Sequence, residues 1–190
     1  MTMKNSTGFT LVETMVAVAI LALAVSGPLF AASRALVAAD ISQGQLTASY
    51  LAQEGIEYVR AMRDDAYLHA YQANGSNVSQ DAWTDFTTGS NSWSITPCTA
   101  SACTLDPLRS SSQVAACSGA ACDAPLYILS TGVYSMQNLS GAEVTPFSRT
   151  IQAFAVAGYP DDERIVSTVK WKFHGVPYVV TVTDNLTSWQ

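Results

Sequence analysis

The chain has 190 residues, which is enough for one domain with a sizeable core and one long accessory helix. Hydrophobic residues make up 48% of the chain and charged residues only 13%, about half of the usual fraction in a soluble domain. The formal net charge is −6, and nine scattered lysines and arginines do not form the basic face that binding to nucleic-acid phosphates requires. We therefore expect no nucleic acid as the main partner.

The deficit of charge is concentrated in a long apolar run near the N-terminus. A polar segment of eight residues with one cation, Lys4, comes first, and residues 14–33 then form a stretch of 20 without any charge. This length matches the ~20 residues that a helix needs to cross ~30 Å of hydrocarbon. Lys4 precedes the run and Arg34 follows it, so the cations do not fix the orientation. The cysteines and strand-rich sequence beyond the run predict that the C-terminal side is external.

The alternative for this run is an ordinary secretory signal sequence. Residues 31–33, Ala-Ala-Ser, resemble the small-residue cleavage site that follows the apolar stretch of such a signal. The length of the run and the carboxylate of Glu13 at its head argue against this alternative. A carboxylate costs roughly 2.5–3.5 kcal/mol or more at mid-bilayer, and less near the interface, so a generic signal gains nothing from carrying one.

Residues 8–13 at the head of the run read Gly-Phe-Thr-Leu-Val-Glu. This segment resembles the processing motif of type IV prepilins and pseudopilins, because a short charged leader, a glycine before an aromatic residue and a glutamate at the head of the membrane helix coincide. The resemblance implies that a prepilin peptidase cuts after Gly8 and so removes residues 1–8 as a leader. It further implies that Phe9 becomes the N-methylated terminus and that Glu13 is the fifth residue of the mature chain.

The position of Glu13 fits a role in assembly. Residues four apart lie on the same face of a helix, so Glu13 is placed to compensate the Phe9 amine that cleavage exposes, either its own or a neighbour's. A charge in apolar surroundings is tolerated only when it is paired. We expect the terminus of the adjacent subunit to be this partner in a filament and to set the axial register. The alternative is that Glu13 only sits in the headgroup layer of the membrane.

The predicted helix has two parts, a transmembrane part at residues 9–33 and an amphipathic part at residues 34–66. Pro28 lies near the end of the first part, where it removes a backbone hydrogen bond and predicts a kink. In the second part apolar residues recur at helical spacing to about Ala66. We expect this apolar face to lie against a sheet.

Residues 67–125 are expected to form a loop-rich, cysteine-containing region with at most short structure. Its four cysteines form two C-x4-C pairs, which favour disulfides over a zinc site, since this spacing is marginal for zinc and no histidine lies nearby. Sequence alone leaves three connectivities open. Local pairing closes two short loops, nested pairing would form a ladder across a hairpin, and local pairing is slightly favoured. The disulfide candidates are Cys98, Cys103, Cys117 and Cys122.

The pattern changes to β-strands in residues 126–190, which are rich in valine, isoleucine, tyrosine, threonine and phenylalanine. His174 and Gly175 join two of these runs and predict a hairpin turn. An acidic run at residues 161–163 is interpreted as a solvated turn. A long helix followed by an antiparallel sheet is the pilin architecture, so the expected fold class is α+β. The predicted strands are residues 126–130, 132–136, 148–155, 164–173 and 178–183.

No group of residues with catalytic spacing is evident, so we expect no enzyme, no cofactor and no metal site. His69 and His174 have no cysteine or carboxylate in ligand spacing. Glu54 and Glu57 lie in residues 51–60, a stretch that resembles minor pilins related to the pilus modification proteins. Both glutamates are interpreted as solvated side chains rather than a catalytic pair.

The expected function is that of a minor pilin or pseudopilin, which leaves the bacterial cytoplasmic membrane and packs into a type IV pilus or a secretion or competence pseudopilus. The expected partners are the prepilin peptidase, other pilin or pseudopilin subunits, and membrane lipid before assembly. The alternatives are a major pilin, or a tip subunit for adhesion or DNA uptake that binds through the cysteine-containing region. Pilus, type II secretion and competence systems share this kind of helix.

Overall fold

The computed structural model describes residues 8, 10–73, 76–109 and 112–188. The chain divides into two units, residues 1–43 and residues 44–190. The described part of the first unit is almost entirely helical. The second unit contains the continuation of the same helix, further short helices and the strands of two sheets.

The longest element is helix α1, Leu11–Gln72. In the first unit its large apolar side chains are exposed, as a membrane-spanning segment requires. The helix passes through Pro28 without a break in helical structure, and the kink expected at this residue stays a prediction. In the second unit one face of α1 is buried. The helix continues beyond the expected end near Ala66, because Ala70 extends that buried face.

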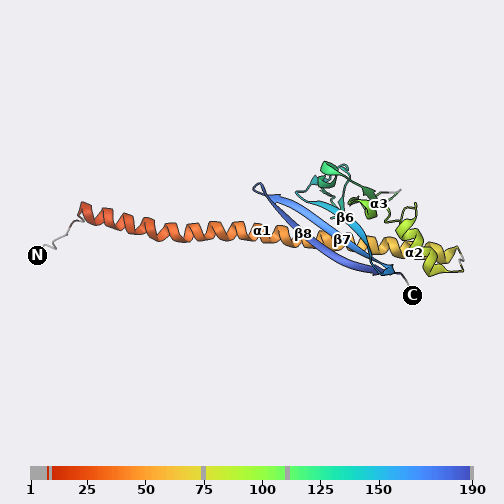
Figure 1. Ribbon diagram of the computed structural model, residues 1–190. Helices are drawn as coiled ribbons and strands as arrows, with labels where there is room; N and C mark the ends of the chain where they lie inside the picture. The colour runs from red at the N-terminus through yellow and green to blue at the C-terminus, as the bar shows by residue number, and fades with distance from the viewer. Residues whose placement is uncertain (1–7, 9, 74–75, 110–111, 189–190) are drawn as a thin grey trace, which may run out of the picture. The chain divides into compact units, whose positions relative to one another are not determined.

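An antiparallel five-stranded sheet forms the main layer of the second unit, in the strand order β2-β1-β6-β7-β8. Figure 1 shows β6, β7 and β8 beside the second half of α1. Ile56 and Val59 of α1 share a hydrophobic core with Ile151 of β6 and Ile165 of β7. The long helix and the antiparallel sheet confirm the predicted α+β class. The strands are β1 Cys103–Leu105, β2 Val114–Ala116, β6 Ser148–Val156, β7 Tyr159–Phe173 and β8 Val176–Thr187.

The second unit also contains a smaller sheet of three short strands, in the order β4-β3-β5. Tyr134 of this sheet packs against a second hydrophobic cluster. This cluster joins Leu51 of α1 to Leu126, Phe147 and Trp171. The indole ring of Trp171 has the ring of Phe147 at 5.9 Å and that of Tyr178 at 5.3 Å between centroids, so aromatic packing fixes this end of the sheet. The small strands are β3 Tyr127–Ile128, β4 Tyr134–Ser135 and β5 Glu143–Val144.

The β7–β8 hairpin turns at His174 and Gly175, as predicted. Their φ angles are +50° and +81°, two consecutive left-handed residues of the kind that a two-residue type I′ turn requires. Phe173 pairs with Val176 across the turn. The hairpin therefore follows from local turn chemistry.

The acidic run at residues 161–163 is part of a strand, so its interpretation as a solvated turn is wrong. The chain turns earlier, at Gly158 with a φ of +84°, and β7 has already begun when the acidic run is reached. Glu163 pairs with Ala155 of β6 and with Leu186 of β8. Only 6% of its surface is exposed, and burial raises the pKa of its carboxyl group.

The region expected to be loop-rich contains a regular helix, α2, Val78–Thr88. It buries Trp83 and Phe86, whose ring centroids lie 5.6 Å apart. The indole Nε1 of Trp83 donates a hydrogen bond to the carbonyl of Pro160 at 3.1 Å, which ties α2 to the start of β7. Aromatic burial therefore holds a helix in a segment of weak helix formers. Short turns follow at α3, Pro97–Ala100, and η1, Gly119–Asp123.

Candidate functional site

The first functional segment is the start of α1, which Thr10 caps. Its hydroxyl Oγ1 accepts a hydrogen bond from the backbone N–H of Glu13 at 3.3 Å, and its carbonyl accepts one from the N–H of Thr14 at 3.2 Å. Threonine followed three residues later by glutamate is the sequence of a capping box, which satisfies otherwise unpaired N–H groups of the first turn. The Glu13 carboxylate also lies at the positive end of the helix dipole. Within a single chain, Glu13 therefore has a local role in starting the helix.

Gly8 precedes this cap and is exposed. A Cβ atom built on Gly8 would meet no described atom within 4 Å. The fold of the described residues therefore does not require glycine at this position. Phe9 lies outside the described residues, so its expected place on the same helix face as Glu13 stays a prediction.

Large apolar side chains of α1 are exposed throughout the first unit, for example Leu11 at 76%, Leu21 at 63% and Leu29 at 66%. An 18-residue window of α1 has a mean hydropathy of 2.3, and none of this window is buried. The helix is long and apolar enough to cross a membrane by length and composition. Exposed apolar surface of this extent marks a membrane or protein contact.

Hydroxyl groups within the apolar run are hydrogen-bonded inside the helix itself. Thr14, Ser26 and Ser33 donate to carbonyls three or four residues earlier, at 2.8, 3.0 and 2.9 Å. These bonds satisfy the hydroxyl protons without water, which lets the side chains stand in hydrocarbon. Glu13 is then the one charged side chain in residues 5–33.

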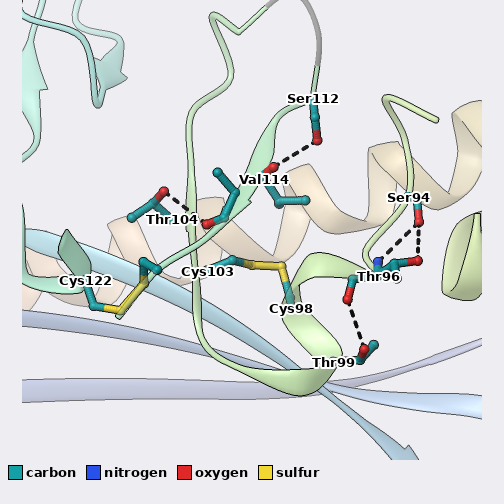
Figure 2. The surroundings of a disulfide bond; sticks show 11 residues. Ser94, Thr96, Cys98, Thr99, Cys103, Thr104, Ser112, Val114 and Cys122 are labelled. Carbon is teal, nitrogen blue, oxygen red and sulfur yellow. Dashed lines mark hydrogen bonds between the residues drawn. A yellow bond between two sulfur atoms is a disulfide. The ribbon is translucent and has the colours of Figure 1, made fainter. Parts of the chain in front are cut away.

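The cysteines pair locally, Cys98 with Cys103 and Cys117 with Cys122, with Cα–Cα distances of 5.1 and 5.2 Å. Figure 2 shows the first disulfide between α3 and β1, and both of its cysteines are fully buried in the main core. The second disulfide joins the residue after β2 to η1. A β1–β2 hairpin does form, as nested pairing would require, but in its register Cys103 faces Ala116 instead of Cys117.

Side-chain hydrogen bonds hold the chain before the first disulfide, as Figure 2 shows in part. The hydroxyl Oγ1 of Thr96 lies 2.7 Å from Ser94 Oγ and donates to the carbonyls of Thr87 and Gly89 at 3.1 and 2.9 Å. The hydroxyl of Thr99 donates to the carbonyl of Thr96 at 2.9 Å. These bonds fasten α3 to the end of α2, so the segment that carries the first disulfide belongs to the folded core.

A buried ion pair between α1 and β6 was missed by the sequence reasoning. The side chain of Arg149 is 0% exposed, and its Nη1 donates to the Glu54 carboxylate at 2.7 Å and to the Leu51 carbonyl at 3.1 Å. Burial lowers the pKa of the Arg149 guanidinium, and the Glu54 carboxylate acts in the opposite direction. The interpretation of Glu54 as a merely solvated side chain is wrong, because it is the counter-ion of a buried cation. The signal for this pair was an arginine that alternates with Ile151 and Ala153, on the buried face of β6.

Two further contacts tie α1 to the edge strand β8. Arg60 donates to the carboxylates of Asp184 and Glu57, each at 2.7 Å. Arg63 donates to the carbonyl of Thr187 at 3.2 Å. The hydrogen bond to Asp184 raises the pKa of Arg60. Glu57 itself is exposed, as predicted, and pairs within its own helix.

Two glycines of α1 let the sheet approach the helix closely. A Cβ atom on Gly55 would lie 2.7 Å from Ser167 Oγ, and one on Gly44 would lie 2.9 Å from Trp171 Nε1. Both distances are shorter than real Cβ contacts, so a larger residue would require the Ser167 hydroxyl or the Trp171 indole to shift. At Gly27, by contrast, a Cβ atom would meet no described atom within 4 Å.

The sequence matches a protein-family model described as the prokaryotic N-terminal methylation motif, over residues 3–27. The matched range contains Gly8, the Thr10 cap, Glu13 and the first turns of α1. Neither the curated proteins nor the solved structures include a significant match to the chain.

Proposed function

We propose a specific role for this chain, which carries the prepilin-type N-terminal methylation motif and a long apolar helix and so fits a type IV pilin-like protein. In this role it is a minor pilin or pseudopilin, assembled through α1 into a type IV pilus or a related secretion or competence pseudopilus. The observation that carries the proposal is an exposed apolar helix with a single carboxylate near its head. The motif points to a structural subunit rather than an enzyme.

Assembly exchanges lipid for the helices of neighbouring subunits around the first part of α1. Packing against apolar neighbours compensates the lost contact with lipid, because both surroundings are apolar. Glycine inside a helix costs roughly 0.8–1.0 kcal/mol relative to alanine, and the single chain gains no packing from having it at Gly27. A close approach by a neighbouring helix is a use for this small residue, since small residues let helix backbones approach.

Processing is proposed to occur between Gly8 and Phe9, with prepilin peptidase as the partner. Since the described fold leaves room at Gly8, a larger residue there changes cleavage without disturbing folding. Gly8→Leu is expected to leave an uncut precursor, observed by intact mass as a chain that retains residues 1–8. Ser6→Leu, in the same leader, is the matched control and is expected to be cut. A mature chain of normal mass from Gly8→Leu would contradict the proposed site.

Glu13 is proposed to pair with the N-methylated Phe9 amine of the adjacent subunit in the filament. The Thr10 cap is compatible with this pairing, because it engages the backbone N–H of Glu13. The carboxylate has no hydrogen bond or ion pair with any residue that the structure describes, so it is available to a partner. Pairing would neutralise two charges in apolar surroundings and would set the axial register.

Before assembly the chain is proposed to lie in the bacterial cytoplasmic membrane through the first part of α1, with the second unit external. The two disulfides support this orientation, because disulfides persist in oxidising compartments outside the cytoplasm. Protease added to intact spheroplasts is expected to digest the second unit, with a cytoplasmic protein as the protected control. A second unit that is cut only after lysis would contradict the orientation.

The subunit composition of filaments tests the proposed minor role, and the identity of the crosslinked partners tests which machine the chain serves. A minor subunit is expected to be a small fraction of sheared filaments, whereas a major pilin would dominate the preparation. Crosslinking in cells followed by purification of this chain identifies the partner subunits and hence the machine. A tip-binding role is tested with exposed side chains of residues 96–125 only, because deleting the segment would remove Cys98, Cys103 and Leu105 from the core.

A further inference from the structure

A small cavity lies beside α1 in the second unit, at a place that the filament role does not use. Its volume is ≈ 120 Å³. Sites for drug-sized ligands and cofactors occupy roughly 300–1,000 Å³, so this cavity is too small to enclose a nucleotide or another large cofactor. It is lined by Met62, Asp65, Ser92, Trp93, Arg109 and Gln113.

Two of the lining residues carry a buried polar atom that has no hydrogen-bond partner among the described residues. One is the indole Nε1 of Trp93, which can only donate, and the other is Oε1 of Gln113, which can only accept. The indole ring stacks on His69 with centroids 3.8 Å apart and an interplanar angle of 12°, which holds its plane in place. A donor and an acceptor that are both buried and unpaired call for a bound group with both functions.

Two opposite charges line the same cavity. Asp65 extends from α1 and Arg109 from the loop after β1, and both side chains are exposed. They form no ion pair with each other, and neither side chain has a salt bridge or hydrogen bond to another residue in the described ranges. The cavity therefore offers a free anion and a free cation beside a donor and an acceptor.

We propose that this cavity binds a small α-amino acid as its zwitterion. The ligand carboxylate would accept hydrogen bonds from Arg109 and from the Trp93 N–H, and the ligand ammonium would donate to Asp65 and to Gln113 Oε1. A water takes about 30 Å³ in the liquid, so the cavity has room for about four waters. Glycine or alanine fits this space, whereas an aromatic amino acid does not. The site goes beyond the filament role, since assembly through α1 does not need it.

The test is calorimetric titration of the full chain in detergent micelles with L-alanine as the probe. Saturable binding of one alanine per chain is expected. Propionate lacks the ammonium group and ethylamine lacks the carboxylate, so each is expected to bind at least about tenfold more weakly. L-phenylalanine is expected not to bind. Absence of saturable alanine binding would overturn the proposal and leave a cavity filled by water only. Equal binding of propionate would overturn it in favour of a simple anion site.

Three variants test the assigned groups. Asp65→Asn and Arg109→Gln are each expected to weaken alanine binding at least about tenfold, and both change exposed side chains, so the fold is preserved. Trp93→Phe keeps an aromatic ring but removes the N–H donor, and it is expected to weaken binding as well. Asp40→Asn, an exposed carboxylate of the first unit, is the matched control and is expected to bind alanine normally. Unchanged affinity in both Asp65→Asn and Arg109→Gln would refute the site.

Discussion

Substitutions at Glu13 separate charge pairing in the filament from capping of the helix. Glu13→Gln removes the charge but keeps a polar side chain of nearly the same shape, which is also accepted at this position of a capping box. Glu13→Ala removes both the charge and the polar side chain, and keeps the backbone N–H that donates to Thr10. Thr10→Ala is the matched control, because it removes the hydroxyl that accepts the Glu13 N–H and leaves the carboxylate in place.

The two roles differ in energy by an amount that an assembly assay resolves. Losing a cap costs about 0.5–2 kcal/mol, and losing an anion at a helix N-terminus costs about 0.3–1 kcal/mol. Removing one partner of a buried ion pair costs about 3–5 kcal/mol, because the other charge is left uncompensated. At about 1.4 kcal/mol for each factor of ten, the pairing role corresponds to roughly two to four orders of magnitude in incorporation. The capping role corresponds to roughly 30-fold or less.

The assay compares sheared filaments with membranes from cells that make only the variant chain, by quantitative immunoblotting. Glu13→Gln and Glu13→Ala are both expected to stay in the membrane with the second unit folded, and Thr10→Ala is expected to be incorporated within about 30-fold of the parent. Normal incorporation of Glu13→Gln together with failure of Glu13→Ala would show that a polar side chain, not its charge, is the requirement. That result would refute the pairing argument.

Three further predictions concern the second unit, and thermal melts followed by near-ultraviolet circular dichroism check each of them. Glu54→Ala is expected to cost about 3–5 kcal/mol, because it leaves the fully buried Arg149 without its carboxylate, whereas Arg149→Met is expected to cost less, because Glu54 is 32% exposed and becomes solvated. Equal losses would contradict this asymmetry. Replacing Cys98 and Cys103 together by alanine is expected to destabilise more than the same change at the second disulfide. Both changes lose about 2 kcal/mol of loop entropy, but only the first empties a fully buried volume, and equal costs would contradict that reasoning. Glu163→Gln is expected to stabilise the protein above about pH 4.5. Burial raises the folded-state pKa of Glu163 above its ordinary value of 4.5, so the folded state binds this proton more tightly, and the stability it contributes is lost as pH rises through the raised pKa. The advantage of the variant should therefore be absent below pH 4.5 and grow above it, and a difference that does not change with pH would argue against burial as the cause.

Local patterns in the sequence predicted much of the fold. The helical spacing of apolar residues in 51–66 predicted the buried face of α1, because a helix packed on a sheet buries one stripe. Alternation in residues 164–173 predicted strand β7, which lies between β6 and β8 and buries the side chains of residues 165, 167, 169 and 171. The turn at His174 and Gly175 followed from glycine's access to positive φ. These features depend on neighbours in sequence, so the sequence was sufficient for them.

The features that were missed depend on residues far apart in the chain. Arg149 and Glu54 are 95 positions apart, and the local sequence around either residue does not predict its partner. Helix α2 forms in a polar segment because Trp83 finds its hydrogen-bond acceptor at Pro160, 77 positions away. The acidic run at residues 161–163 was misassigned because the turn was placed at the charges instead of at Gly158. In each case the second unit's packing outweighed the local propensity.

Contacts within the single chain explain some residues of α1, whereas others require a neighbouring subunit. Contacts with the sheet account for Gly44 and Gly55, because a Cβ atom at either position would come within 3 Å of the side chain of Trp171 or Ser167. The single chain gives no such reason for Gly27, which raises the free energy of an isolated helix. At Glu13 the favourable position at the helix N-terminus contributes about 0.3–1 kcal/mol, which is less than the roughly 2.5–3.5 kcal/mol that an unpaired carboxylate costs at mid-bilayer. Lipid compensates the exposed apolar side chains but leaves these two costs in place. A neighbouring helix that approaches closely and brings an amine to the carboxylate compensates both, so the filament proposal accounts for what the membrane alone leaves unexplained.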